Sequence, residues 1–200
     1  MAAVDSTSNA VLVPILPPQE LAKPTPLDIT VGHALPSEAT AIAKIGTDTF
    51  TAAFAYAIPT ADLAEYLAAT YSEVVVPADM KDSTVQTWVA RDSSGKVWGF
   101  VQLVRGLSEP CVPGDPATHA ELRRLYIDTT AHGRGIGSKL VAAVEEQARA
   151  EGFKQLWLMV WDGNASAERL YLRLGYQRCG TIPFRIGGSR FTGYALSKSL

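Results

Sequence analysis

The chain has 200 residues, of which 47% are hydrophobic and 19% are charged, and its formal net charge is −2. This composition is typical of a globular protein and excludes a chain that is disordered throughout. The slightly acidic balance disfavours a nucleic-acid binder, and no apolar run approaches the ~20 residues that a membrane-spanning helix needs. The two cysteines match no disulfide framework and no metal-ligand spacing, so we expect free thiols and no bound metal.

The first 26 residues differ in composition from the rest of the chain. Five prolines stand between positions 14 and 26 and favour an extended segment. Residues 11–16 are apolar, but no basic residue precedes them, which argues against a secretory signal and for a cytoplasmic protein. We therefore predict an extended N-terminal tail at residues 1–26 and one folded domain at residues 27–200.

Hydrophobic periodicity and turn residues predict the elements of the first half. Residues 28–33 alternate as a strand does, and a helical pattern follows Pro36. Thr60 is the expected cap of a second helix. The elements that follow are a β-hairpin of residues 84–90 and 97–104 around the turn at 92–95, and a long loop at 106–118.

The second half alternates strands and helices more clearly. The helix predicted at residues 135–151 has an apolar stripe and ends at Gly152, and we expect its outward face to carry Lys139, Glu145, Glu146 and Arg149. This order of elements indicates an α/β or α+β fold with a central sheet. The other predicted elements are strands at 121–127, 155–161, 176–184 and 190–196, and a helix at 164–175.

A glycine-rich turn lies between the predicted strand at 121–127 and the helix at 135–151. It reads His132-Gly133-Arg134-Gly135-Ile136-Gly137-Ser138. Closely spaced glycines let backbone N–H groups converge at a helix N-terminus, which favours a phosphate or pyrophosphate, and Arg134 can add a charged contact. The same glycines also suit an ordinary turn. A P-loop and a dinucleotide fingerprint fit less well, because Lys139 follows Ser138 and because Ser138 stands where the third glycine should be.

Two blocks of the chain resemble the GNAT superfamily of acyl-CoA-dependent N-acetyltransferases. The first block is His132-x-x-Gly135-x-Gly137, similar to the family pattern Q/R-x-x-G-x-G/A with His in the first position. The second block is Asn164-x-x-Ala167-x-x-x-Tyr171-x-x-x-Gly175-Tyr176, similar to N-x-x-A-x-x-x-Y-x-x-x-G-F/Y. The resemblance covers roughly residues 84–200. It implies the GNAT fold, with a central, mixed, mostly antiparallel sheet of about seven strands and helices on both faces.

Three short segments of the sequence are similar to the polyamine (spermidine/spermine) N-acetyltransferase branch of the superfamily. They lie at residues 50–54, 121–127 and 156–162. The resemblance implies acetyl-CoA as co-substrate, no metal, and transfer of the acetyl group to a primary amine of a small molecule by direct attack in a ternary complex. A polyamine-like acceptor is included in this expectation, although acceptor choice changes easily on one fold.

The resemblance also assigns the contacts to acetyl-CoA. Backbone groups of Leu125 and Ile127 would pair with the pantetheine arm, and a bulge near them would separate their strand from the next and open a slot. Asn164 is in addition a favourable helix cap. The residues expected to bind acetyl-CoA are Leu125, Ile127, His132, Gly133, Arg134, Gly135, Ile136, Gly137, Ser138, Asn164, Ala167 and Tyr171.

Two residues are the expected catalytic groups. Tyr171 matches the family's general acid, and its phenol would protonate the leaving thiolate, although a tyrosine among leucines also suits the core. Glu121 is a candidate base for the amine proton, and it could equally pair with Arg123 or Arg124. His119, two residues earlier, is a second candidate base, and water is a third.

Acceptor and assembly are left open by the sequence. A protein or peptide N-acetyltransferase and a non-catalytic acyl-CoA-binding sensor are the alternatives to a small-amine enzyme. The expected ligands are acetyl-CoA and the acceptor amine, and a second copy of the chain, in a homodimer, is included among the partners. Neither nucleic acid nor a membrane is expected. The acids that could border a pocket for a polyamine are Glu65, Glu73, Asp79, Asp82, Glu109 and Asp115.

Overall fold

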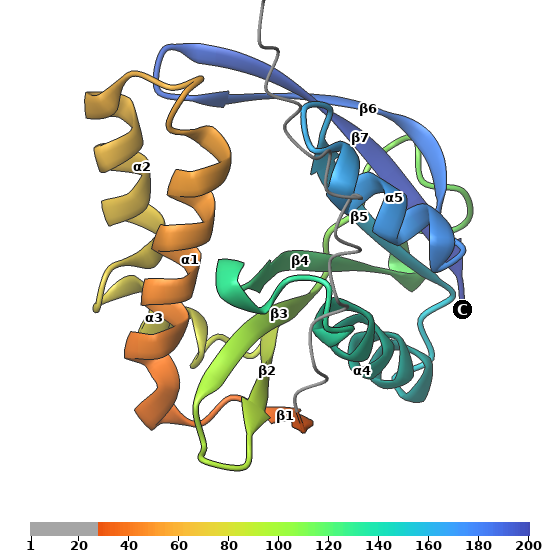
Figure 1. Ribbon diagram of the computed structural model, residues 1–200. Coiled ribbons are helices and arrows are strands. Elements are labelled where there is room, and N and C mark those ends of the chain that lie inside the picture. Colours follow the sequence, from red (N-terminus) through yellow and green to blue (C-terminus); the bar gives the residue numbers. More distant parts are fainter. Residues whose placement is uncertain (1–27) are drawn as a thin grey trace, which may run out of the picture.

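The computed structural model describes residues 28–200, so the extended tail predicted at residues 1–26 lies outside the described part. One sheet, with helices on both sides, makes up this part (Figure 1). The strands are β1 Ile29–His33, β2 Val85–Asp92, β3 Val97–Arg105, β4 His119–Ile127, β5 Gln155–Trp161, β6 Gln177–Ile186 and β7 Ser189–Ser199. The helices are α1 Ala39–Phe54, α2 Thr60–Tyr71, α3 Val75–Asp79, α4 Ile136–Ala150 and α5 Ala165–Arg173, with short 3-10 turns at Pro36–Glu38, Pro116–Thr118 and Thr129–Ala131.

The strand order in the seven-stranded sheet is β1-β2-β3-β4-β5-β7-β6. Only β4 and β5 run parallel, and all other neighbouring strands are antiparallel. The mixed, mostly antiparallel seven-stranded sheet predicted from the sequence is therefore confirmed. No helix in residues 28–200 is long and apolar enough to cross a membrane.

Successive side chains of the central strands point to opposite faces of the sheet and belong to two separate hydrophobic cores. Trp88, Ala90 and Val101 face α4 and α5, whereas Val89 and Phe100 face α1, α2 and α3. The predicted apolar stripe of α4 is buried in the first of these cores, as expected for an amphipathic helix on a sheet. Helices consequently cover both faces, as the sequence predicted (Figure 1).

Two local expectations were wrong, and one short helix was missed. Thr60 is the first residue of α2 and not its cap, and no side chain caps that end. The five-residue helix α3 was missed, because it is too short to show a period and contains Pro77. Glu145 does not lie on an outward face. It is buried and forms ion pairs with Arg149 and with Lys198 of β7, a partner that the period of one helix cannot reveal.

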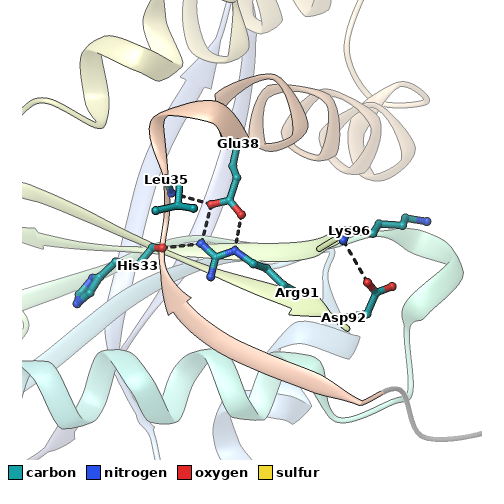
Figure 2. A network of polar contacts seen from close by, with 6 residues as sticks. All are labelled: His33, Leu35, Glu38, Arg91, Asp92 and Lys96. Atoms are coloured by element: carbon teal, nitrogen blue, oxygen red, sulfur yellow. Dashed lines mark hydrogen bonds and ion pairs between the residues drawn. The ribbon is translucent and has the colours of Figure 1, made fainter. Parts of the chain in front are cut away.

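A network of charged and polar contacts fixes the connection from β1 to α1 (Figure 2). The carboxylate of Glu38 accepts hydrogen bonds from the guanidinium of Arg91 on β2 and from the backbone N–H of Leu35. Arg91 also donates to the backbone carbonyl of His33 at 2.6 Å. The side chains of Arg91 and Glu38 are only 19% and 11% exposed, so solvent weakens this pair less than a surface pair. The hydrogen bond from Arg91 lowers the pKa of Glu38.

We predict that Glu38→Gln lowers the free energy of unfolding by about 1 kcal/mol at neutral pH, since it weakens a charge-assisted hydrogen bond. Because the folded protein has the lower pKa, the contribution of Glu38 is complete above the unfolded value of ~4.3 and is lost as the pH falls through the folded value. Denaturant unfolding of both proteins from about pH 7 to about pH 3 measures this difference.

Asp48→Asn is the matched control, because Asp48 pairs with Lys44 on the exposed face of α1, where the side chains are 56% and 74% exposed. We expect this variant to change the stability by less than ~0.5 kcal/mol. Equal losses in the two variants would show that the Glu38–Arg91 pair has no special place in the fold.

Candidate active site

The two parallel strands at the centre of the sheet separate after their first three residues. β4 and β5 pair only from His119 to Glu121 and from Gln155 to Trp157. Beyond this point β4 continues to pair with β3, and β5 continues to pair with β7. The inner edges of the two strands are therefore unpaired beyond this point, and the strands diverge (Figure 1). We call the unpaired stretch between them the slot.

The backbone of Arg124 marks the point where β4 bends away. Its φ of +54° makes it the one non-glycine residue of positive φ in residues 28–200, and the register between β3 and β4 shifts beside it. This conformation is costly for an arginine, and surrounding contacts must hold it. The guanidinium of Arg124 pairs with Asp79 on α3 and lies 5.5 Å from the ring centre of Tyr71. The bulge predicted near Leu125 is thus present, one residue before it.

A cavity of about 580 Å³ lies on one side of the slot. Residues 125–127 of β4, residues 131–138 and α5 supply most of its walls, and Thr49, Ala53 and Phe54 of α1 complete it. Every residue that the sequence predicted to bind acetyl-CoA lines this cavity except Arg134. The structure therefore brings together three segments that are separated in the chain.

The glycine turn in this cavity has the geometry of an anion-binding helix start. Gly133 and Gly135 have φ values of +74° and +79°, which side chains other than glycine rarely adopt. Gly135 is the N-cap of α4, so no side chain caps the first backbone N–H groups of the helix. A Cβ at Gly137 would lie 3.3 Å from Leu170, so glycine lets α4 and α5 come close. The uncapped helix start fits a phosphate or pyrophosphate group.

His132, which stands where the family pattern has Gln or Arg, turns back towards the strand. Its Nε2 atom lies 3.1 Å from the carbonyl oxygen of Ile127, and the hydroxyl of Thr49 donates to the same oxygen at 3.4 Å. The carbonyl expected to pair with a pantetheine arm is therefore already contacted by two side chains. His132 holds the glycine turn against β4 rather than extending beyond it.

α5 carries the remaining predicted contacts. The side-chain oxygen of Asn164 accepts from the backbone N–H of Ala167 at 3.1 Å, which confirms the predicted cap. Tyr171 follows two turns later, so both side chains reach the same cavity. The side chain of Tyr171 is buried, and burial raises the pKa of its phenol. The hydroxyl consequently stays protonated at neutral pH, as a general acid must.

A second cavity, of about 460 Å³, lies on the other side of the slot. Its walls come from residues 121–126 of β4, residues 159–161 of β5 and residues 184–186 of β6, and aromatic residues of α1 and α2 also line it. The two cavities share Phe54, Leu125, Tyr126, Asn164, Ala167 and Tyr171. Tyr171 thus lies at the junction, where a group bound in one cavity would meet a group bound in the other.

The two candidate bases occupy different places. Glu121 lines the second cavity, and its carboxylate accepts two hydrogen bonds from Arg123, so the alternative of a partner for Arg123 is also realised. His119 is buried beside the loop at 106–118, where its Nδ1 atom lies 2.7 Å from the hydroxyl of Ser108. It lines neither cavity. Of the two side chains, only Glu121 is therefore within the site.

The acids expected beside the acceptor are elsewhere. None of Glu65, Glu73, Asp79, Asp82, Glu109 and Asp115 lines the second cavity, whose one carboxylate in the described chain is Glu121. Asp79 pairs with Arg124, while Asp82 and Asp115 cap turns of their own segments. Asp82 and Asp115 thus serve local structure, whereas Asp79 holds a residue of β4 that is distant in the chain.

Sequence reasoning did not identify the residues of α1, α2 and β6 that line the second cavity. Phe50, Tyr66 and Arg185 line it, although they lie far apart in the chain. The rings of Phe50 and Tyr66 stack at 4.4 Å, and Trp161 of β5 lies 4.7 Å from Phe54. Only the three-dimensional fold brings these side chains together, so no spacing in the sequence signals them.

The profile of the Acetyltransferase (GNAT) family matches residues 48–176, and the chain therefore belongs to this family. It is an acetyl-CoA-dependent N-acetyltransferase, of the acyltransferase class EC 2.3.1.-. In residues 28–200 no group of three or more His, Cys, Asp and Glu side chains could hold a metal ion.

Three relatives illustrate the range of this family. An uncharacterized N-acetyltransferase of Mycobacterium tuberculosis is 26% identical over 164 residues, which cover 82% of this chain and 99% of the relative. An L-methionine sulfoximine/L-methionine sulfone acetyltransferase of Pseudomonas aeruginosa is 29% identical over 103 residues, or 48% of this chain and 52% of the relative. The spermine/spermidine N(1)-acetyltransferase of Bacillus subtilis is 34% identical, but over only 64 residues, or 32% of this chain and 42% of the relative.

Solved structures share the fold. The PaiA N-acetyltransferase of Thermoplasma acidophilum, in complex with coenzyme A, superposes with a TM-score of 0.68 over 86% of this chain and 99% of its own, at 16% identity. YncA of Salmonella typhimurium, solved with acetyl-CoA, gives a TM-score of 0.62 over 86% and 94% of the two chains, at 20% identity. Both structures hold a form of coenzyme A.

We predict that Gly135→Asp weakens acetyl-CoA binding at least ~10-fold, because it puts a negative charge at the helix start that should hold pyrophosphate. A Cβ at Gly135 meets no atom within 4 Å, so the cost of the substitution is the strain of an aspartate at positive φ, roughly 1–2 kcal/mol, and a melting curve checks that the variant is folded. Calorimetric titration with acetyl-CoA measures the change.

Gly152→Asp is a closely matched control. Gly152 also has positive φ, of +84°, and open space at its Cβ, but it lies beyond the other end of α4. We expect its affinity for acetyl-CoA to equal that of the unmodified protein. Unchanged affinity in folded Gly135→Asp would mean that the turn does not bind the pyrophosphate.

Proposed function

We propose that this enzyme transfers the acetyl group of acetyl-CoA to the primary amine of a small molecule by direct attack in a ternary complex, and that residues 27–200 carry the activity. The observation that carries the proposal is the meeting of two cavities at Tyr171. One cavity has an uncapped helix start for a pyrophosphate, and the other has room for a small acceptor. Cavities on opposite sides of one slot hold both reactants at once, which supplies proximity and orientation.

The cofactor cavity would hold acetyl-CoA through three groups of contacts. The first N–H groups of α4 would hold the pyrophosphate, the inner edge of β4 at Leu125 and Ile127 would accompany the pantetheine arm, and Asn164 and Ala167 would flank its far end. When bound, acetyl-CoA supplies an activated thioester. The chain itself would orient that thioester beside the second cavity, supply a proton to the leaving thiolate and take up the proton that the amine loses.

The acceptor amine reacts as a neutral nucleophile. Its nitrogen forms a bond to the acetyl carbon while the carbon–sulfur bond breaks, and the sulfur takes the electron pair of that bond. Tyr171 donates its phenolic proton to the departing thiolate. The amine proton leaves to Glu121 or through water, and a proton from solvent restores the phenol. The ion pair with Arg123 occupies the Glu121 oxygens, so transfer through a water beside this pair is the route that we propose.

The alternatives fit the site less well. A non-catalytic sensor would need only the cofactor cavity, whereas the second cavity and the protonated Tyr171 at the junction suit a reaction. A protein or peptide acceptor is the other alternative, and the second cavity, of about 460 Å³, has the size that suits a small amine. The free thiols of Cys111 and Cys179 fit a reducing compartment, so the proposal includes a cytoplasmic location, and a homodimer stays part of the prediction.

We predict that Tyr171→Phe lowers kcat by ~100-fold, at the low end for general-acid catalysis because thiolate is already a fair leaving group. The KM for acetyl-CoA should change little, since the proton is needed only as charge develops on sulfur. Steady-state release of coenzyme A, with a melting curve for each protein, measures both effects.

Tyr176→Phe is the control, because Tyr176 is also buried and its ring lies 5.7 Å from that of Tyr171, yet it lines neither cavity. Its kcat should match that of the unmodified enzyme. If Tyr171→Phe keeps full activity, its hydroxyl is not the acid, and water or another group must fill that role.

A further inference from the structure

The two cysteines of the chain lie against each other in the fold, although they are 68 positions apart in the sequence. Cys111 belongs to the loop between β3 and β4, and Cys179 belongs to β6. Their Sγ atoms are 3.8 Å apart, so the two free thiols are in contact without a bond between them. Neither residue lines either cavity, and the proposed acetyl transfer uses neither thiol. The fold therefore holds together two nucleophilic groups that this reaction does not explain.

The loop that carries Cys111 is positioned by contacts with the sheet. The backbone carbonyl of Leu107 accepts a hydrogen bond from the indole N–H of Trp157 on β5 at 3.1 Å. Val112, the neighbour of Cys111, is buried. The loop thus spans from β5 to Cys179 on the edge strand β6 (Figure 1). The thiol of Cys111 is consequently brought to β6 by a segment that is anchored on its way.

The backbone of β6 is shaped for this contact. The register between β6 and β7 shifts between Arg178 and Gly180, so Cys179 is the extra residue of a β-bulge. A bulge redirects the side chain that it carries, and the thiol of Cys179 also donates to the carbonyl oxygen of Ala195 at 3.5 Å. A Cβ at Gly180 would lie 2.8 Å from the Sγ atom of Cys111, so glycine is needed where the loop meets the strand. The bulge and the glycine are two separate features that place the thiols together.

We propose that Cys111 and Cys179 are a redox pair, which a peroxide oxidises to an intramolecular disulfide and a cellular thiol reduces again. One cysteine attacks a peroxide oxygen as its thiolate, the O–O bond breaks, and the products are a sulfenic acid and water. The other cysteine attacks the sulfur of the sulfenic acid, the S–O bond breaks, and a second water leaves. Two thiols and one hydrogen peroxide thus give one disulfide and two waters. Two molecules of the cellular thiol reverse the change through a mixed disulfide and become a disulfide themselves.

The surroundings of the pair determine how the oxidation proceeds. Burial raises the pKa of the Cys111 thiol, which lowers its thiolate fraction at neutral pH. We therefore expect Cys179 to react with the peroxide first and Cys111 to attack the sulfenic acid. Because the second sulfur already lies 3.8 Å away, the disulfide should form before further oxidation to a sulfinic acid. Transient disulfides in cytosolic proteins are usually of this redox-responsive kind.

The disulfide would clamp the loop to the edge of the sheet. A change from 3.8 Å to the ~2.0 Å of a disulfide needs only a small movement of two half-buried side chains. The bond would join the loop to β6, the last strand of the sheet, and would close a long ring of chain that restricts the unfolded state. We expect the melting temperature of the oxidised protein to be higher by ~5 °C or more.

To test the pair, the full reduced chain is treated with a small excess of hydrogen peroxide, the peroxide is removed, and the remaining thiols are blocked with N-ethylmaleimide. Peptide mass mapping should show the peptides of Cys111 and Cys179 linked, with the loss of two hydrogen atoms, and non-reducing electrophoresis should show that the link lies within one chain. Dithiothreitol should separate the two peptides and return the melting temperature to that of the reduced protein.

Three variants separate the position of the thiols from their presence. Gly180→Ala keeps both cysteines but places a Cβ against Cys111, and we expect it to form the disulfide at least ~10-fold more slowly. Cys111→Ser and Cys179→Ser are the controls, and peroxide should leave their melting temperatures unchanged because no disulfide can form within either chain. A melting curve of each reduced variant checks its fold, and the two serine variants keep the test valid if Gly180→Ala does not fold.

Several outcomes would overturn the proposal. Thiols that stay unmodified under peroxide, a sulfinic acid in place of the disulfide, or disulfides formed only between chains would show that the contact is not a redox pair. A disulfide within the chain that leaves the melting temperature unchanged would overturn the clamp. Oxidation of folded Gly180→Ala at the rate of the unmodified protein would show that glycine at this position does not control the approach of the thiols.

Discussion

The backbone conformation of Arg124 is the constraint on which the site depends. A left-handed arginine inside a strand costs roughly 1–2 kcal/mol, and the ion pair with Asp79 and the ring of Tyr71 hold it there. The resulting bulge turns β4 away from β5 after Glu121, although both strands keep their outer partners. A sheet that is otherwise continuous thereby gains a slot at its centre. α3 was the element that sequence periodicity missed, yet its Asp79 helps to hold the residue that opens the site.

The slot also divides the chemistry between two cavities with different means of recognition. On the cofactor side, we propose that recognition relies on the backbone, through the uncapped start of α4 and the edge of β4. Backbone groups suit a co-substrate that every member of the family shares. On the acceptor side, recognition relies on side chains from α1, α2, β4, β5 and the β6–β7 hairpin, which can change without disturbing the sheet. The side chains that line the second cavity are therefore the part of the structure in which we expect the choice of acceptor to be encoded.

The sequence predicted the cofactor side far better than the acceptor side, for a physical reason. The glycine turn and α5 are contiguous segments whose positive φ values and cap leave local signals, and Gly133, Gly135 and Asn164 all adopt the predicted roles in the backbone. The strands and longer helices likewise follow from periodicity. Arg185, Phe50 and Tyr66 share a cavity only after folding, and the buried Glu145 depends on Lys198, 53 residues away. Partners of this kind leave no pattern within a window of one element, so the sequence could only name acids as candidates for the border of the acceptor pocket, and none of them lines it.

In the proposed mechanism, the slot between β4 and β5 holds the reacting group at the junction beside Tyr171. A crystal structure of the full chain with coenzyme A would show whether it does. We expect the pyrophosphate on the first N–H groups of α4, the pantetheine arm along Leu125 and Ile127, and the sulfur within hydrogen-bonding reach of the Tyr171 hydroxyl, with β4 and β5 still apart beyond Glu121. Coenzyme A bound outside the slot, or a sulfur far from Tyr171, would contradict the account.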